Sequence, residues 1–274
     1  QMDEDKNYDY SKRYTTQVAT EADKYYIQPG YTTAKLHFDR EPRFYATLGF
    51  DGSSWYGIGK MDDNDMWYLQ AKAKQASGKR GNTLYSITGY FAKKLVRYQN
   101  AMVPASIQIE TYPFPIIRLA DLYLLYAEAL NELTQEYSFP TYDGRGTVTV
   151  SRNVEKMRSA FSQVRFRAGL PDADNYDDAA QFRVTLKRER QIELFAESAR
   201  YFDLRRWKDA PTEEVGPIKG FNINITSSKR EDFYKETVIS RVQKRWMDKM
   251  YLWPIPKNET DRNVKLQQNP GWER

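Results

Sequence analysis

The sequence predicts a mainly α-helical protein with long irregular loops and a few short strands. Between residues 113 and 210, apolar residues return at intervals of three and four, which is the period of helices that pack on one face. Residues 1–112 lack this period and are punctuated by glycine, proline and aspartate, which indicates loops. We therefore expect a loop-rich, ligand-binding region at 1–112, a helical core at 113–210, and a C-terminal segment at 211–274 that packs on the core.

Two short alternating runs in the first region, 35–38 and 44–48, are candidates for strands. The only histidine of the chain, His37, lies in the first of these runs. A Ser-His-Asp triad or a His-rich metal site would have to be built around this one residue. We therefore expect His37 to be a structural or surface residue.

The first expected helix begins near Pro115, because proline suits a first helical turn. Its apolar residues occupy two adjoining faces, so that polar residues are left with a narrow stripe. Such a helix is largely buried, and we expect Leu125 to lie in the core. The polar stripe consists of Arg118, Asp121, Glu128 and Glu132.

A second helix is expected at 153–167, after a long loop at 134–151. Gly169 ends it, since glycine can adopt the left-handed conformation of a helix cap. Asp177 or Asp178 then caps the third helix, because an aspartate side chain can accept hydrogen bonds from the first backbone amides.

Residues 182–207 contain the third helix, followed directly by a fourth that runs from about Ala199 until Pro211 stops it. Charged residues populate the faces beside an apolar seam, and Arg190 and Glu193 are spaced to pair within the helix. The expected seam consists of Phe182, Leu186, Ile192, Phe195 and Ala199.

These four helices form two antiparallel pairs, with the tyrosine-rich sequence YAEAL at 126–130 in the first. This arrangement is typical of tetratricopeptide-like helical hairpins that stack into a superhelix. In the last region, 218–225 is a candidate strand, a helix is expected within 230–250, and 269–271 fits a type II turn.

Several motifs stand in a fixed order along the chain. They are RLADLYLLYAEALNEL at 118–133, VRFRAGLP at 164–171, the segment 182–207, YLWPIP at 251–256 and QNPGW at 268–272, with a weaker echo in EPRFYATLG at 41–49. In this order they resemble the C-terminal half of the SusD/RagB family, the surface lipoproteins that capture nutrients for outer-membrane transporters of Bacteroidetes. The resemblance implies a helical scaffold that supports an irregular, ligand-bearing face.

The resemblance also implies function and location. It implies a non-enzymatic, surface-exposed protein of the outer membrane that captures a glycan or a peptide and delivers it to a SusC-like TonB-dependent transporter. Family members are longer than this chain and carry an N-terminal signal and a lipidated cysteine. We therefore expect the chain to be a C-terminal piece, in contact with the membrane only through a lipid anchor on the missing N-terminal part.

Composition narrows the remaining possibilities. The chain has 42 Lys and Arg against 37 Asp and Glu, and this small excess forms no basic stripe of the kind that a nucleic-acid interface needs. It has no cysteine, which excludes disulfides and thiolate chemistry, and no apolar run long enough to span a membrane. Glu189, Glu193 and Glu197 are better explained by ion pairs than by the carboxylate pair of a glycosidase. We expect no catalytic residues, no cofactor and no metal.

The expected ligand site consists of Trp55, Tyr56, Trp67 and Tyr68. These two Trp-Tyr pairs lie in loops rich in glycine, serine and aspartate, where no helical or strand period assigns all four rings to a core. Sugar rings pack their C–H faces on aromatic planes, while their hydroxyl groups need polar partners at the edge. The alternative, that these rings only cover the core, stays open, as does a calcium site at the acidic residues 62–65.

Two other functions stay open. One is a peptide-binding member of the same family. The other is a helical-repeat scaffold that recognises another protein, which would expose an apolar groove and would need no small ligand.

Overall fold

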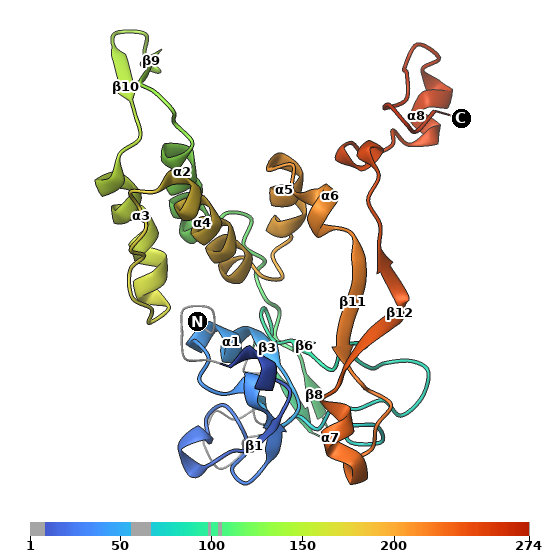
Figure 1. Cartoon of the computed structure of the whole chain (residues 1–274). Helices are drawn as coiled ribbons and strands as arrows, with labels where there is room; N and C mark the ends of the chain where they lie inside the picture. The colour runs from blue at the N-terminus through green and yellow to red at the C-terminus, as the bar shows by residue number, and fades with distance from the viewer. Residues whose placement is uncertain (1–8, 56–66, 98–99, 104–105, 274) are drawn as a thin grey trace.

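The protein is described by a computed structural model that covers residues 9–55, 67–97, 100–103 and 106–273 (Figure 1). The N-terminal segments lie together at the bottom of Figure 1, the helices lie above them, and a long hairpin leads up one side to the C-terminal segment. No helix in the described ranges is both long and apolar enough to cross a membrane.

The N-terminal part is built from short antiparallel strand pairs around two small apolar clusters. One cluster includes Ile27, Phe38 and Phe50, and the other includes Phe221 and Tyr234 from the C-terminal region. The strand pairs are β1 (Thr16–Val18) with β2 (Thr32–Ala34), β3 (Leu48–Gly49) with β6 (Phe91–Ala92), β4 (Ser54–Trp55) with β5 (Trp67–Tyr68), and β7 (Ala101–Val103) with β8 (Ser106–Gln108).

The two strands considered at 35–38 and 44–48 were wrong. Residues Lys35–His37 form a 3-10 turn, η3, as do η1 (Tyr10–Lys12) and η2 (Glu21–Asp23). Residues 44–47 of the second run lie in helix α1 (Pro42–Thr47), which begins with proline at its first position, and only Leu48 belongs to a strand, β3. An alternating pattern over four or five residues is too short to separate a strand from one helical turn.

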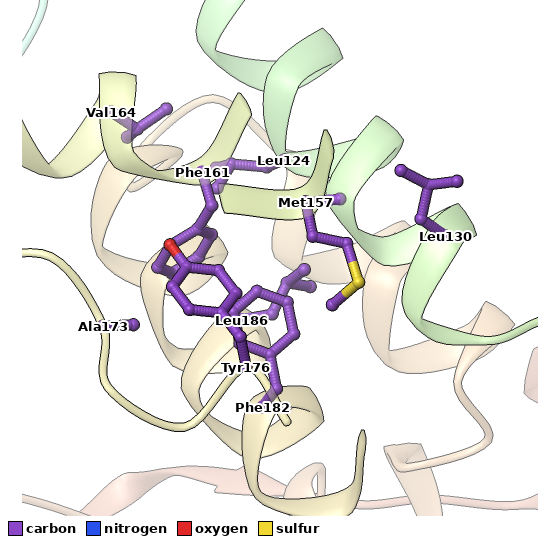
Figure 2. Packing of buried hydrophobic residues seen from close by; sticks show 10 residues of the cluster. Leu124, Leu130, Met157, Phe161, Val164, Ala173, Tyr176, Phe182 and Leu186 are labelled. Carbon is purple, nitrogen blue, oxygen red and sulfur yellow. The ribbon is translucent and has the colours of Figure 1, made fainter. Parts of the chain in front are cut away.

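Within 113–210, which the structure describes completely, the prediction of four helices is confirmed. They are α2 (Leu119–Asn131), α3 (Val154–Arg167), α4 (Ala179–Glu193) and α5 (Ala199–Arg206), with the short α6 (Ala210–Glu213) at the end. The first three share one core, shown in Figure 2, in which Phe161, Tyr176 and Phe182 pack together at ring-centroid distances of 4.8–6.1 Å.

The prediction that α2 is largely buried was wrong. Leu124, Ala127 and Leu130 face the core formed with α3 and α4, whereas Leu125 is 37% exposed. The helix also begins at Leu119 and not near Pro115. Apolar residues surround α2, and periodicity alone could not tell which of its faces the neighbouring helices cover.

The predicted ends of α3 and the predicted beginning of α4 are confirmed. The Asn153 side chain accepts a hydrogen bond from the amide of Lys156, and Asp178 accepts from the amides of Ala180 and Gln181. Gly169 adopts φ +72°, the left-handed conformation expected after the end of α3.

The boundaries after α4 differ from the prediction. Ala196 and Ser198 adopt positive φ and separate α4 from α5 by a sharp bend. Pro211 does not stop a helix, because α5 ends at Arg206 and the proline instead stands in the first turn of α6. Phe195 of the predicted seam is exposed, while Arg190 and Glu193 are buried.

The segment 134–151 is not a plain loop. It forms a hairpin of β9 (Tyr137–Pro140) and β10 (Thr147–Val150) that projects from the helices in Figure 1. Gly144, with φ +67°, allows the tight turn between the two strands.

Of the helix expected within 230–250, only one short turn is present, and most of the segment is a strand. A short α7 (Arg230–Phe233) is followed by β12 (Glu236–Lys244), which pairs with β11 (Gly216–Phe221), so the strand considered at 218–225 is found in part. Thr237, Val238 and Ile239 are β-branched and favour this pairing. The remaining short helices of this region are the 3-10 helices η4 (Ser227–Lys229) and η5 (Asp248–Tyr251) and the α-helix α8 (Lys257–Arg262). The turn at 269–271 is present, with Gly271 at φ +80°.

Candidate functional site

The β4–β5 pair brings together aromatic residues that are distant in the sequence. Trp55 lies directly opposite Trp67, and Ser54 lies opposite Tyr68. Residues directly opposite each other in an antiparallel pair place their side chains on the same face. The two tryptophans therefore share a face. Tyr56, the fourth expected ligand residue, and the acidic residues 62–65 lie outside the described residues.

The two tryptophans have different environments. Trp55 is half-buried, and its ring lies so close to Gly49 that a Cβ atom there would be 2.9 Å from the ring atom Cζ3. Trp67 is 43% exposed. Trp55 is thus the more buried ring of the two, and Trp67 is the more accessible one.

Lys93 lies beneath this surface. Its ammonium group is buried, donates to the carbonyl oxygens of Tyr45 and Ser54 at 3.3 and 3.0 Å, and lies 5.9 Å from the ring centroid of Trp55. Burial disfavours the charged form and lowers the pKa of Lys93 to about 8. The lysine fixes the beginning of the β4–β5 pair to α1.

Two further aromatic residues, Tyr25 and Tyr26, lie next to the β4–β5 pair. The amide of Ser54 donates to the Tyr26 carbonyl at 2.9 Å, and the Ser54 hydroxyl donates to the Tyr25 carbonyl at 2.7 Å. On the other strand, the Tyr68 hydroxyl donates to the carbonyl of Lys24 at 3.3 Å. These contacts hold the tyrosine pair against the edge of the hairpin.

Tyr25 is 54% exposed and Tyr26 is 43% exposed. Tyr26 stacks on Tyr45 of α1, with ring centroids 4.2 Å apart. We call the whole set, Tyr25, Tyr26, Trp55, Trp67 and Tyr68, the aromatic platform. The sequence reasoning missed its first two members, although they form an adjacent aromatic pair in a turn-rich segment, which is the same signal that singled out the Trp-Tyr pairs.

A buried ion pair supports the loop before β4. Lys72 and Asp51 are buried and paired, and Asp51 also accepts hydrogen bonds from the hydroxyls of Tyr234 at 2.5 Å and Tyr31 at 3.1 Å. Burial and the neighbouring Asp51 carboxylate raise the pKa of Tyr234. A buried charge pair is tolerated when hydrogen bonds satisfy its remaining groups, as they do here.

His37 is fully buried and cannot act on a ligand. Its ring stacks on Phe50 at 4.0 Å, with Nδ1 2.8 Å from the Thr33 hydroxyl and Nε2 3.0 Å from the Tyr90 hydroxyl. Burial holds its pKa well below the ordinary value. The structural role expected for His37 is therefore confirmed.

The carboxylates of α4 form ion pairs. Arg43 of α1 donates to Glu189 at 2.6 Å and to Glu193 at 3.0 Å, and Glu193 also pairs with Arg167 at 2.6 Å and Arg118 at 3.0 Å. Burial raises the pKa of Glu193, but the hydrogen bonds from Arg167 and Arg43 outweigh it and the net pKa is lowered. We call these five residues the Arg43 network.

Arg190 does not pair with Glu193 as its spacing suggested. It reaches Asp203 of α5 at 2.9 Å and Asp121 of α2 at 2.8 Å, so that its partners lie on neighbouring helices. Among the described residues, no group of three or more acidic, histidine or cysteine side chains could hold a metal ion.

Comparisons with known proteins agree with this architecture. The family model described as the SusD family matches residues 2–272. The SusD-like protein P38 of Formosa agariphila is 35% identical over 106 residues, which are 38% of this chain and 19% of P38.

Solved structures have the same fold. BT4246 is 26% identical with a TM-score of 0.77, over 98% of this chain and 43% of that one. A SusD-like protein from Bacteroides fragilis (BF3747) is 28% identical with a TM-score of 0.64, over 86% of this chain and 40% of that one. The chain thus spans less than half the length of these relatives. With a helical core, short strands and a family match over nearly its whole length, the chain belongs to the SusD family.

Proposed function

We propose that the protein is a non-enzymatic, cell-surface nutrient-binding protein of the outer membrane. It captures a glycan and delivers it to a SusC-like TonB-dependent transporter. The observation that carries the proposal is the aromatic platform, in which accessible rings come from two separate segments that are hydrogen-bonded to β4. Membership in the SusD family supports the delivery step and a lipid anchor on an N-terminal part.

In this proposal the three regions have separate roles. Residues 1–112 carry the ligand site, and the helices of 113–210 form tetratricopeptide-like units. Residues 211–274 pack partly on the first region, through Phe221 and Tyr234, and partly on α5, through Trp253. Trp67 stacks on a sugar ring, Trp55 supports Trp67 from the opposite strand, and Tyr68 contributes a ring at the edge. Tyr56, next to Trp55 in the chain, is the fourth proposed ligand residue. Aromatic rings on a surface of fixed backbone suit sugars, because they bury C–H faces with little loss of side-chain entropy.

The test is a binding screen of the full-length protein against oligosaccharides and peptides, followed by calorimetric titration of each hit. Trp67→Ala is expected to weaken glycan binding by roughly 1–3 kcal/mol, the scale of a stacking aromatic. The melting curve should stay nearly unchanged, because Trp67 is accessible. Chromatography of the ligand after prolonged incubation should recover it intact.

A matched control is Tyr142→Ala, since Tyr142 is fully exposed at the turn of the β9–β10 hairpin. It should bind as the wild type does. Saturable binding of peptides without any glycan would instead establish the peptide-binding alternative. Wild-type protein that binds no glycan in the screen contradicts the proposal.

One observation favours a second function, that of a protein-interaction scaffold. A groove between α2 and α3, of about 680 Å³, is lined by Leu119, Leu122 and Tyr126 on the outer face of α2. Contiguous exposed apolar surface of this kind often marks a contact with another protein. Leu122→Glu should abolish such a contact and leave glycan binding unchanged.

A further inference from the structure

A polar cavity lies where α1 meets the helical core. Helix α1, the loop after α3 and one face of α4 line it, and no residue of the aromatic platform is among the described residues of its lining. Its volume of about 400 Å³ is in the range of small-ligand sites. The charged residues of the lining are four acids and three arginines: Glu41, Asp172, Asp174, Glu189, Arg43, Arg165 and Arg188.

Two of the arginines are held by acids of the protein itself. Arg43 donates to Glu41 at 2.8 Å and to Glu189 at 2.6 Å. Arg165 donates to Glu189 at 3.2 Å and to the carbonyl oxygen of Pro171 at 2.6 Å. Because these guanidinium groups are engaged and carboxylates outnumber arginines in the lining, the cavity favours a positively charged ligand.

Three acceptor groups of the lining remain for such a ligand. Glu41 is 5% exposed, and both hydrogen bonds that it accepts from described residues, from Nε and Nη2 of Arg43, reach the same oxygen, Oε2. Asn175 donates from Nδ2 to the Thr185 hydroxyl at 2.8 Å, while its buried Oδ1 accepts no hydrogen bond from the described residues. Asp174 is exposed and forms no ion pair with a described residue. A buried acceptor without a donor is unfavourable, so this lining favours a ligand that supplies donors.

The two buried acceptor groups lie close enough for one small molecule. Asn175 is bonded to Thr185 of α4, and Arg43 joins Glu41 to Glu189 of the same helix. Thr185 and Glu189 are four residues apart, which is about 6 Å along a helix axis. A single sugar ring or a lysine side chain with its backbone can therefore reach both levels.

We propose that this cavity binds an ammonium group. The ammonium nitrogen donates to Oε1 of Glu41, other donors of the same ligand reach Oδ1 of Asn175, and Asp174 attracts the cation at the mouth. An ammonium group carries three donors and no acceptor, which matches the groups that the lining offers. The inference is independent of the proposed glycan-binding function. Two classes of molecule carry this chemistry, an amino sugar and the lysine side chain of a peptide.

The experiment is calorimetric titration of the full-length protein with two matched pairs of probes. One pair is glucosamine and N-acetylglucosamine, and the other is the terminally blocked peptide Gly-Lys-Gly and its Nε-acetylated form. Acetylation removes the charge of the amine. At least one of the two amines should bind with a Kd below about 1 mM, and its acetylated partner about ten-fold more weakly or less. Whichever amine binds identifies the class of ligand.

Two variants locate the site. Glu41→Gln keeps the shape of the side chain without its charge and should weaken binding of the amine about ten-fold. Asp174→Asn, on the surface, should weaken it about three-fold, and this variant keeps the test decisive if Glu41→Gln lowers the melting temperature. The matched control is Asp177→Asn, because Asp177 is an exposed acid of the same loop outside the described lining. It should bind as the wild type does.

Several results overturn the inference. It fails if neither amine binds with a Kd below about 1 mM, or if the acetylated probes bind equally well. It also fails if both Glu41→Gln and Asp174→Asn bind as the wild type does. Trp67→Ala should leave binding of the amine unchanged, and a loss there would place the amine on the aromatic platform. That result would overturn this inference and leave the proposed function standing, whereas a wild type that binds amines but no glycan would do the opposite.

Discussion

Replacing Lys72 with methionine should lower the free energy of unfolding by about 3–5 kcal/mol. Lys72 is 3% exposed and Asp51 is fully buried, so the substitution leaves a carboxylate in the interior without its counter-charge. Asp51 keeps the hydroxyls of Tyr234 and Tyr31 and the amide of Ala71, at 2.5, 3.1 and 2.7 Å. These donors offset part of the loss, so we expect a value near the lower limit.

The assay is urea denaturation monitored by tryptophan fluorescence. The slope of the unfolding free energy against urea concentration must be the same for wild type and variant, so that the difference reports stability alone. Lys12→Met is the control, because Lys12 pairs with Asp9 at 3.2 Å on the exposed surface and such pairs contribute at most about 1 kcal/mol. The double variant Asp51→Asn, Lys72→Met should recover much of the loss, since no charge is left unpaired. A loss below about 1 kcal/mol for Lys72→Met would refute the reasoning on buried charge.

Three further predictions follow from buried side chains. Leu124→Ala should cost about 2–5 kcal/mol in denaturation experiments, whereas Leu125→Ala, on the exposed side of α2, should cost less than about 1 kcal/mol. The pKa of His37 is lower in the folded protein than its value of about 6.5 in the unfolded chain. The free energy of unfolding should therefore fall by about 1.4 kcal/mol per pH unit as the pH drops below 6.5, because the unfolded chain then takes up a proton that the folded protein does not. His37→Gln should not show this pH dependence. Folding lowers the pKa of Lys93 from 10.5 to about 8, so between these pH values the unfolded chain binds a proton that the folded protein has lost. The free energy of unfolding should therefore increase by about 3 kcal/mol as the pH is raised from 8 to 10.5, and Lys93→Met should abolish this increase.

The parts of the fold that could be predicted are those with local causes. The caps Asn153 and Asp178 and the left-handed Gly169 depend on backbone groups within a few residues of themselves. The sequence therefore reveals both ends of α3 and the beginning of α4 directly. The segment 230–250 was misread because β12 depends on pairing with β11. Its charged and polar residues, read without the partner strand, suit a helix equally well.

The buried charges could not be predicted from spacing. Glu193 and Arg190 stand at helical positions that suggest a solvated face, yet their partners Arg118 and Asp121 lie about 70 positions earlier in the chain, on or next to α2. A carboxylate on a helix is buried only when arginines from other elements surround it, and such a set of partners leaves no periodic signal. The resemblance to the family drew attention to this segment, but the contacts that explain it come from the structure.

Three of the five residues of the aromatic platform could be singled out from the sequence. Trp55, Trp67 and Tyr68 stood out because aromatic residues are uncommon in polar loops, and the structure places the two tryptophans on one face. Tyr25 and Tyr26 were missed because backbone carbonyls, not side chains, bring them to Ser54. Backbone contacts of this kind depend on the path of the chain. The adjacent aromatic pair could therefore mark Tyr25 and Tyr26 as candidates, but residue type could not place them beside β4.

The short helix α1 links the platform to the helical core. Its Arg43 enters the Arg43 network with Glu189 and Glu193 of α4, and two residues later Tyr45 stacks under Tyr26 and accepts a hydrogen bond from Lys93. One turn of helix thus orients the platform on one side and is fixed by buried ion pairs on the other. A binding surface is most specific when its supporting residues are themselves held rigidly. The motif EPRFYATLG at 41–49 covers this helix, and its Arg43 and Tyr45 are explained by that support without any contact to a ligand.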